Sequence, residues 1–174
     1  MKIIFMQEQH HLKDVLEDRS VVVLPEQGEH INAAGGEIFL KITSDMTKDQ
    51  MGIYEIRLMP GVTGAQLHYH RYMDETFIVT KGKMTIQLSE KEITAEQGSI
   101  VYVPRMTPHG FGNKSDEEAV IMLLFNPGQS REGFFRGLGE ILTETPVDTG
   151  KFLKLYQKYD SYPVDAGNFL PRRN

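Results

Sequence analysis

The stretch Leu67–Gly82, LHYHRYMDETFIVTKG, decides the fold that we expect for this chain. Alternate side chains of a β-strand project from the same face about 7 Å apart, so His68 and His70 would point together. Two imidazoles placed in this way can bind one metal ion. If the strand that follows the turn RYMD pairs with the first strand, Glu75 brings its carboxylate to the same ion, whereas Asp74 should face water.

A second segment, GSIVYVPRMTPHGFGN (98–113), supplies a third histidine. Its apolar run reads as a strand that Pro104 ends, and His109 begins the next run after a turn. A lone histidine is more often an ordinary core or surface residue, but His109 stands where a third imidazole is needed. The chain has only 6 histidines in 174 residues, so composition alone does not explain this arrangement. The combination is therefore hard to explain as an accident of composition.

Short apolar runs separated by turns extend from about Val21 to Asn126. β-Branched and aromatic runs at this spacing indicate an all-β sandwich or barrel. The strand–helix alternation of Rossmann and TIM-barrel folds is missing. The runs expected to form strands include VVVL (21–24), EIFLKIT (37–43), MGIYEIRLM (51–59), TFIVT (76–80), MTIQLS (84–89), SIVYVP (99–104) and EEAVIMLLFNPG (117–128).

After Gly128 the apolar residues take the spacing of two helices. Ser130 and either Asp148 or Thr149 are the expected N-caps. We expect the aromatic residues of these helices to pack on the barrel, and a lid over a ligand pocket is the alternative. The residues at helical spacing are Phe134, Phe135, Leu138, Ile141 and Leu142 in the first helix, and Phe152, Leu153, Leu155, Tyr156 and Tyr159 in the second.

The composition limits the classes of function. A net charge of −5 lacks the basic surplus that nucleic-acid binding requires, so we expect no nucleic-acid partner. The absence of cysteine excludes disulfides and thiolate chemistry and leaves nitrogen and oxygen as metal ligands. No apolar run has the length of a membrane span, and the start MKIIFMQEQHH does not read as a signal peptide. We therefore expect a cytoplasmic protein without a membrane partner.

The two segments resemble the paired motifs of the cupin superfamily, whose members form a small jelly-roll barrel, the double-stranded β-helix. One residue more than is usual in the family separates Gly61 from His68, which predicts a bulge or an added loop residue. Met106 stands in a turn where the family usually has glycine. The residues that match the first motif are Gly61, His68, His70, Glu75 and Gly82, and those that match the second are Gly98, Pro104, His109 and Asn113.

The resemblance implies that His68, His70, Glu75 and His109 bind one divalent transition metal. Iron, nickel, manganese, cobalt, copper and zinc all accept such ligands. His10, His11 and His30 lie outside both motifs and are not expected to be ligands. The segments HYHRYMDETFIVTKGKMTI, VYVPRMTPHGF and FNPGQSREGFFRGLGEIL resemble small single-domain cupins related to quercetin dioxygenases. This resemblance favours a dioxygenase acting on a small aromatic or enolic substrate, with Glu75 as the catalytic base.

Two other kinds of function stay open. A metal-dependent isomerase, epimerase or decarboxylase of a sugar or oxo acid would use the same ligands without O₂, and Arg57 and Arg105 are the only obvious cations for such a polar substrate. A non-catalytic small-molecule-binding module is the alternative from a different class. The pocket of any of these proteins should be apolar, and its expected lining is Phe77, Phe111, Tyr54, Tyr102, Met84 and Phe125.

The expected organisation has three parts. Residues 1–20 form an N-terminal arm, residues 21–128 the barrel, and residues 129–174 a helical extension packed on the barrel. The apolar run AVIMLLF and the unassigned N-terminus favour a homodimer.

Overall fold

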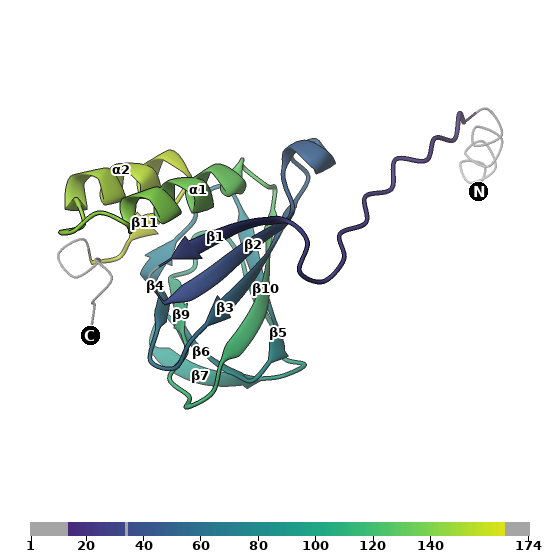
Figure 1. Cartoon of the computed structure of the whole chain (residues 1–174). Coiled ribbons are helices and arrows are strands. Elements are labelled where there is room, and N and C mark those ends of the chain that lie inside the picture. Colours follow the sequence, from purple (N-terminus) through teal and green to yellow (C-terminus); the bar gives the residue numbers. More distant parts are fainter. Residues whose placement is uncertain (1–13, 34, 166–174) are drawn as a thin grey trace, which may run out of the picture.

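A computed structural model describes residues 14–33 and 35–165 of the chain. These residues form two antiparallel sheets, one with the strand order β1-β2-β3-β10-β5-β8 and the other with the order β11-β4-β9-β6-β7. Figure 1 shows the sheets facing each other as a barrel, with two short helices at one end. The all-β jelly roll with a helical tail is therefore confirmed. The strands are β1 (Glu29–Ala33), β2 (Gly36–Ile42), β3 (Gly52–Leu58), β4 (Thr63–Tyr69), β5 (Asp74–Lys81), β6 (Lys83–Leu88), β7 (Lys91–Glu96), β8 (Ile100–Val103), β9 (His109–Gly112), β10 (Ala119–Asn126) and β11 (Tyr162–Pro163).

The core lies between the two sheets because the central strands alternate apolar inward residues with more polar outward ones. In β10, Ile121, Leu123 and Phe125 are all buried. In β5, Phe77 and Val79 lie on the inward face together with Glu75, as counting by twos predicts. One buried face of β5 thus carries both core residues and a carboxylate.

The turns that shape the barrel explain the motif glycines. Gly82, between β5 and β6, has a φ of 69°, and a Cβ there would lie 2.6 Å from the carbonyl oxygen of Glu118. Met106 has a φ of 65°, the left-handed conformation that glycine adopts without strain. The register between β4 and β9 shifts on both sides of Ala65. The expected irregularity between Gly61 and His68 therefore lies within β4 rather than in the loop before it.

Asn113, the last residue of the second motif, is a structural residue. Its side chain is buried and donates from Nδ2 to the backbone oxygens of Leu58 (2.9 Å) and Glu117 (2.7 Å). Its Oδ1 accepts a hydrogen bond from the backbone N–H of Ser115 at 3.0 Å. Asn113 thereby closes the loop between β9 and β10.

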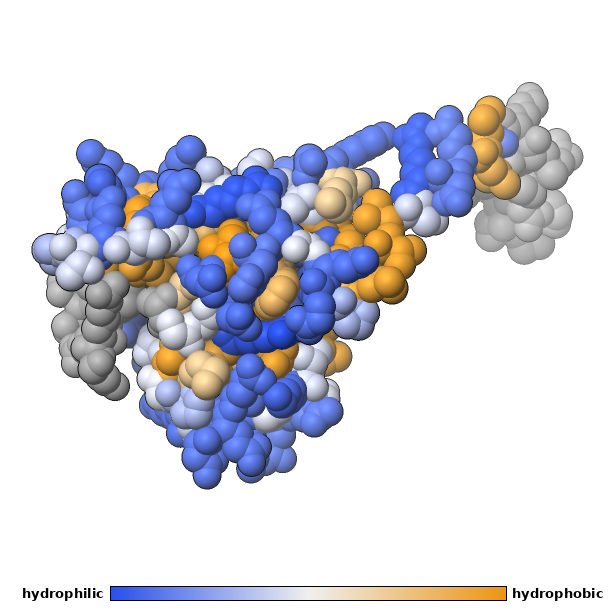
Figure 2. All heavy atoms as spheres, viewed as in Figure 1, coloured by the Kyte–Doolittle hydropathy of each residue, from blue (hydrophilic) through white to orange (hydrophobic). Residues whose placement is uncertain are grey.

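The segment before β1 differs from the prediction. Residues 21–24 form no strand, because no strand of the described chain pairs with them, and β1 begins only at Glu29. Apolar residues of this segment are exposed, among them Leu16 (91%) and Val22 (76%). Figure 2 shows apolar residues in orange on the part of the chain that extends away from the barrel. Strand β7, which the sequence reading missed, pairs with β6 as a hairpin.

The two helices follow β10 and lie side by side at one end of the barrel (Figure 1). They are α1 (Arg131–Ile141) and α2 (Thr149–Lys158). Asp148 caps α2, since its side chain accepts a hydrogen bond from the N–H of Lys151 at 3.0 Å. Ser130 occupies the N-cap position of α1, as expected, but it has a left-handed conformation and makes no side-chain cap bond.

The apolar faces of α1 and α2 join the barrel core, as the packing interpretation predicts. No helix in the described ranges combines the length and the apolar character that a membrane span requires.

Candidate metal centre

Four side chains from different parts of the barrel converge at one point. His68 lies in β4 and His109 opens β9, and the two residues stand opposite each other in the paired strands. His70 follows the end of β4, and Glu75 lies in β5. All four are at most 2% exposed, and one ligand atom of each lies within 4.8 Å of the others.

The predicted four residues therefore come together, although by a different route from the one expected. We expected the strand of Glu75 to pair with the strand of the first two histidines. Instead, β5 pairs with β10 and β8 in the six-stranded sheet, whereas β4 belongs to the other sheet. Glu75 thus reaches the histidines from the opposite wall of the barrel.

Backbone carbonyls fix the orientation of the three imidazoles. Each Nδ1 donates to one carbonyl oxygen: His68 to Gln66 (2.8 Å), His109 to Thr107 (2.8 Å) and His70 to Asp160 (2.5 Å). A carbonyl oxygen can only accept, so each Nδ1 carries the proton and the Nε2 of the neutral ring keeps a lone pair. Such contacts to the second ring nitrogen are typical of histidines that bind metals.

The Nε2 atoms converge on the carboxylate. Oε2 of Glu75 lies 3.0 Å from Nε2 of His70 and 2.8 Å from Nε2 of His109. With Nδ1 protonated, two lone pairs would face an ionised oxygen, an arrangement that needs a proton or a metal cation between the atoms. Three imidazoles and one carboxylate therefore form a donor set suited to a divalent transition metal.

Burial and the neighbouring charges shift the pKa values of the ligand side chains. Burial alone would raise the pKa of Glu75, but hydrogen bonds and charge from His109 and His70 hold it well below its usual value. Burial lowers the pKa of His68 far below its ordinary value, helped by the neighbouring His109 and His70. Burial opposes protonation of His109 as well, but its hydrogen bond to Glu75 raises the pKa overall. Glu75 is thus an ionised carboxylate in contact with two imidazoles, of which His109 holds a proton more readily than His70.

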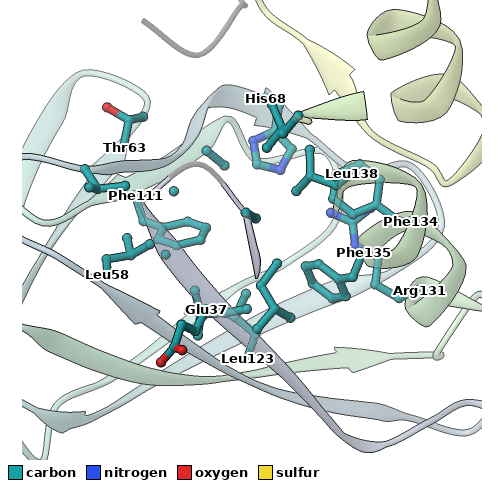
Figure 3. Close-up of a pocket in the computed structure, with 18 of the residues that line it drawn as sticks. Glu37, Leu58, Thr63, His68, Phe111, Leu123, Arg131, Phe134, Phe135 and Leu138 are labelled. Atoms are coloured by element: carbon teal, nitrogen blue, oxygen red, sulfur yellow. The ribbon is translucent and has the colours of Figure 1, made fainter. Parts of the chain in front are cut away.

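A cavity of about 490 Å³ opens beside the cluster and includes His68 and Glu75 in its wall. Figure 3 shows Phe111 and Leu58 on one side of the cavity and Phe135, Leu138 and Arg131 on the helix side. Packing on the barrel and covering a pocket were separate alternatives for the two helices in the sequence analysis. The apolar residues of α1 and α2 pack in the core and also form part of the cavity wall. Phe125 and Tyr156 also line the cavity.

Two of the expected lining residues, Phe111 and Phe125, do line the cavity. Tyr102 does not line this cavity, because it faces outward from β8 at the edge of the sheet and is 60% exposed. Phe77 and Met84 are fully buried, but they belong to the core behind the cavity wall, where Phe77 packs against the ring of Phe111.

Tyr54, the last of the expected lining residues, is also buried outside the cavity wall. Its hydroxyl donates to Oε2 of Glu132 at 2.9 Å.

The expected cations also lie elsewhere. Arg57 pairs with Glu26 and Glu55 at 2.6 Å each, and Arg105 pairs with Asp74. The Asp74 side chain was expected to face water, but it is only 19% exposed in its pair with Arg105.

The cavity cation is Arg131, which the sequence reading missed. A signal was available, because Arg131 shares the i, i+3, i+4 spacing of Phe134 and Phe135 and so lies on the apolar face of α1.

The C-terminal extension contributes directly to the site. The carboxylate of Asp160 accepts hydrogen bonds from the N–H groups of Arg71 (2.9 Å) and Tyr72 (2.8 Å), in the turn that joins His70 to Glu75. Strand β11 then pairs with β4, with Pro163 opposite His68. Of the remaining histidines, His30 contacts Glu37 and stacks on Phe39 away from the cluster, whereas His10 and His11 lie outside the described residues.

Comparisons with known proteins agree with this geometry. Residues 54–125 match the Cupin_2 family, described as a cupin domain. Quercetin 2,3-dioxygenase of Bacillus subtilis (strain 168) is 31% identical over 127 residues, which cover 72% of this chain and 37% of that relative. The match thus spans well under half the length of the dioxygenase.

Solved structures share the fold at low identity. A sugar phosphate isomerase of the cupin superfamily from Silicibacter pomeroyi DSS-3 has a TM-score of 0.55 and 21% identity, over 61% of this chain and 75% of that one. A predicted oxalate decarboxylase from Thermotoga maritima also has a TM-score of 0.55, with 17% identity over 62% of this chain and 99% of that one. The barrel, the paired motifs and these matches together show that the chain is a protein of the cupin superfamily.

Proposed function

We propose that this protein is a metal-dependent cupin enzyme acting on a small organic molecule, with a dioxygenase of the quercetinase type as the leading candidate. One observation carries the proposal: three oriented imidazoles and an ionised carboxylate converge in the wall of an apolar cavity of about 490 Å³. A cavity of this size and lining is typical of small-molecule sites. The 31% identity to a quercetin dioxygenase supports the choice of reaction.

In this proposal His68, His70, Glu75 and His109 hold one divalent transition metal. When bound, the ion would supply open positions for a substrate oxygen and for O₂ or water, together with Lewis-acid stabilisation of charge. Iron, nickel, manganese, cobalt, copper and zinc all fit the donor set.

The chain's own residues then have three tasks. The backbone carbonyls at Gln66, Thr107 and Asp160 keep the imidazoles in one tautomer and one orientation. Phe111 and Phe125 exclude water and pack against an apolar substrate. Glu75 is held ionised, so its carboxylate has lone pairs to accept the proton of an enol or phenol hydroxyl, and its lowered pKa makes it a weak base that releases this proton readily.

The second candidate is an isomerase, epimerase or decarboxylase of a sugar or oxo acid, and a specific observation favours it. Such polar substrates call for a cation in the pocket, and Arg131 is a buried cation in the cavity wall. A non-catalytic binding module would use the same cavity without turnover.

The test is metal analysis of the purified protein, as isolated and after reconstitution, beside His68→Ala. His30→Ala is the matched control, because His30 lies outside the cluster. About one equivalent of metal in the wild type and in the control, with none in His68→Ala, would support the centre. O₂ consumption on flavonols then indicates a dioxygenase, and anaerobic turnover of a sugar phosphate or oxo acid indicates the second candidate. Absence of metal under every condition would contradict the proposal and favour the binding module.

The homodimer is also a proposal. The exposed apolar side chains of Leu16 and Val22 would be covered by a second copy. Size-exclusion chromatography with light scattering tests it, and a monomer at micromolar concentration would contradict it.

A further inference from the structure

Arg131 is a buried cation with an unusual environment. It begins α1, is only 4% exposed, and lines the same cavity as His68 and Glu75. Figure 3 shows it on the helix side of the cavity, beside Phe135 and Leu138. A buried charge is unfavourable unless it is paired and hydrogen-bonded, so the partners of this guanidinium need an explanation.

Other residues of the protein accept hydrogen bonds from only part of this guanidinium. Its Nη1 donates to the backbone oxygen of Tyr159 (2.9 Å) and to Oγ of Ser161 (2.8 Å). Cζ lies 3.8 Å from the ring centre of Phe134 and 4.8 Å from that of Phe125, so the guanidinium is in cation–π contact with both rings. Within the described ranges, no carboxylate lies within 4.0 Å of Arg131, and its buried Nε has no hydrogen-bond partner.

The edge formed by Nε and Nη2 makes no hydrogen bond with the described residues, because both hydrogen bonds come from Nη1 and the buried Nε has no partner. Two other arginines of this protein use that same edge to hold a carboxylate. Arg105 binds Asp74 through Nε (2.9 Å) and Nη2 (3.0 Å), and Arg136 binds Glu29 through Nε (2.9 Å) and Nη2 (2.7 Å). The planar fork of arginine matches a carboxylate in this two-bond geometry.

We propose that Arg131 is the carboxylate-binding residue of the cavity, and that the substrate is an organic acid with an apolar body. This inference rests on the proposed function, since the acid would lie between Arg131 and the metal centre. The carboxylate binds the edge formed by Nε and Nη2, and the apolar body packs against Phe111 and Phe135. Arg131 is thereby a determinant of specificity, which selects acids over neutral molecules of the same shape.

The experiment compares acids with their methyl esters. Benzoate, cinnamate and phenylpyruvate, each beside its ester, are titrated calorimetrically into zinc-loaded and metal-free protein. The variants are Arg131→Gln, which removes the charge, and Arg131→Lys, which keeps the charge without the fork. Arg136→Gln is the matched control, because Arg136 is an exposed arginine of the same helix.

We expect at least one acid to bind the wild type and Arg136→Gln roughly 10- to 100-fold more tightly than its ester, as two charge-assisted hydrogen bonds imply. Arg131→Gln should lose that preference while ester affinity and zinc content stay unchanged. Arg131→Lys should lose roughly tenfold for the acid, and it gives the decisive comparison if Arg131→Gln does not fold.

Two results would overturn the inference: no acid binds the wild type, or the acid preference survives in both Arg131 variants. Zinc content separates these failures from failure of the proposed function. Normal zinc binding without an acid preference refutes only the role of Arg131. A protein that binds no zinc, but whose metal-free form prefers acids through Arg131, refutes only the metal centre.

Discussion

The substitution Asp160→Asn tests whether the C-terminal extension positions the metal ligands. The Asp160 carboxylate is buried and accepts the N–H groups of Arg71 and Tyr72, within the turn between two ligands. Its φ of 56° lies in the left-handed region, which asparagine tolerates far better than alanine does. The variant thus removes one acceptor without adding backbone strain.

The magnitude follows from the two hydrogen bonds. One amide oxygen can still accept, but the NH₂ group would face the other backbone N–H. Loss of one charge-assisted hydrogen bond with an unsatisfied buried donor costs about 2 kcal/mol in the free energy of unfolding. The displaced turn should weaken zinc binding roughly tenfold, the usual lower limit for residues that orient metal ligands.

Urea denaturation gives the free energy of unfolding, and competition with a chromophoric chelator gives the zinc affinity. Asp148→Ala is the control, because removing this helix cap should cost about 1 kcal/mol and leave zinc affinity unchanged. If Asp160→Asn lowers stability but binds zinc as tightly as the wild type, the extension only packs on the barrel and the reasoning is refuted.

Three further predictions concern the barrel and its cavity. The guanidinium of Arg105 lowers the pKa of Asp74 from 3.8 to about 2, so the pair stabilises the fold above pH 4 and this contribution is lost as pH falls toward 2. Because the Arg105 side chain is partly exposed, Asp74→Asn should lower the free energy of unfolding by only about 1 kcal/mol at pH 7, and by almost nothing at pH 2. Urea denaturation at the two pH values measures this, and an equal loss at both would contradict the role of the pair. Met106→Gly should raise the free energy of unfolding by about 0.5 kcal/mol by relieving a left-handed backbone, whereas a loss would show that the methionine side chain stabilises the turn. Phe111→Ala should weaken binding of the tightest-binding aromatic acid roughly tenfold in calorimetry while Tyr102→Ala leaves it unchanged, and equal effects would place the pocket elsewhere.

The local pattern of the sequence predicted an all-β sandwich or barrel, and the resemblance to the paired cupin motifs added the jelly roll and the set of four candidate ligands. Side-chain alternation in a strand follows from backbone geometry alone, so His68 and His70 share a face, and Glu75 and Phe77 share another. Turn chemistry is also local, which is why Gly82 marks the turn between β5 and β6 and why the proline at 104 marks the end of β8.

Strand pairing, burial and the composition of the site depend on residues that are distant in the sequence, so only the tertiary structure decided them. Residues 21–24 have strand composition but no strand to pair with, and Tyr102 has the character of a core residue but lies on the outer face of an edge strand. Glu75 reaches the histidines across the barrel rather than along one sheet. Arg131 and Asp160 enter the site only because α1 and β11 fold back onto the barrel, more than 50 residues along the chain from Glu75. The sequence by itself thus determined which chemical groups are present and which way each strand faces, whereas long-range packing alone decided which of these groups meet, because contacts between distant segments leave no local pattern.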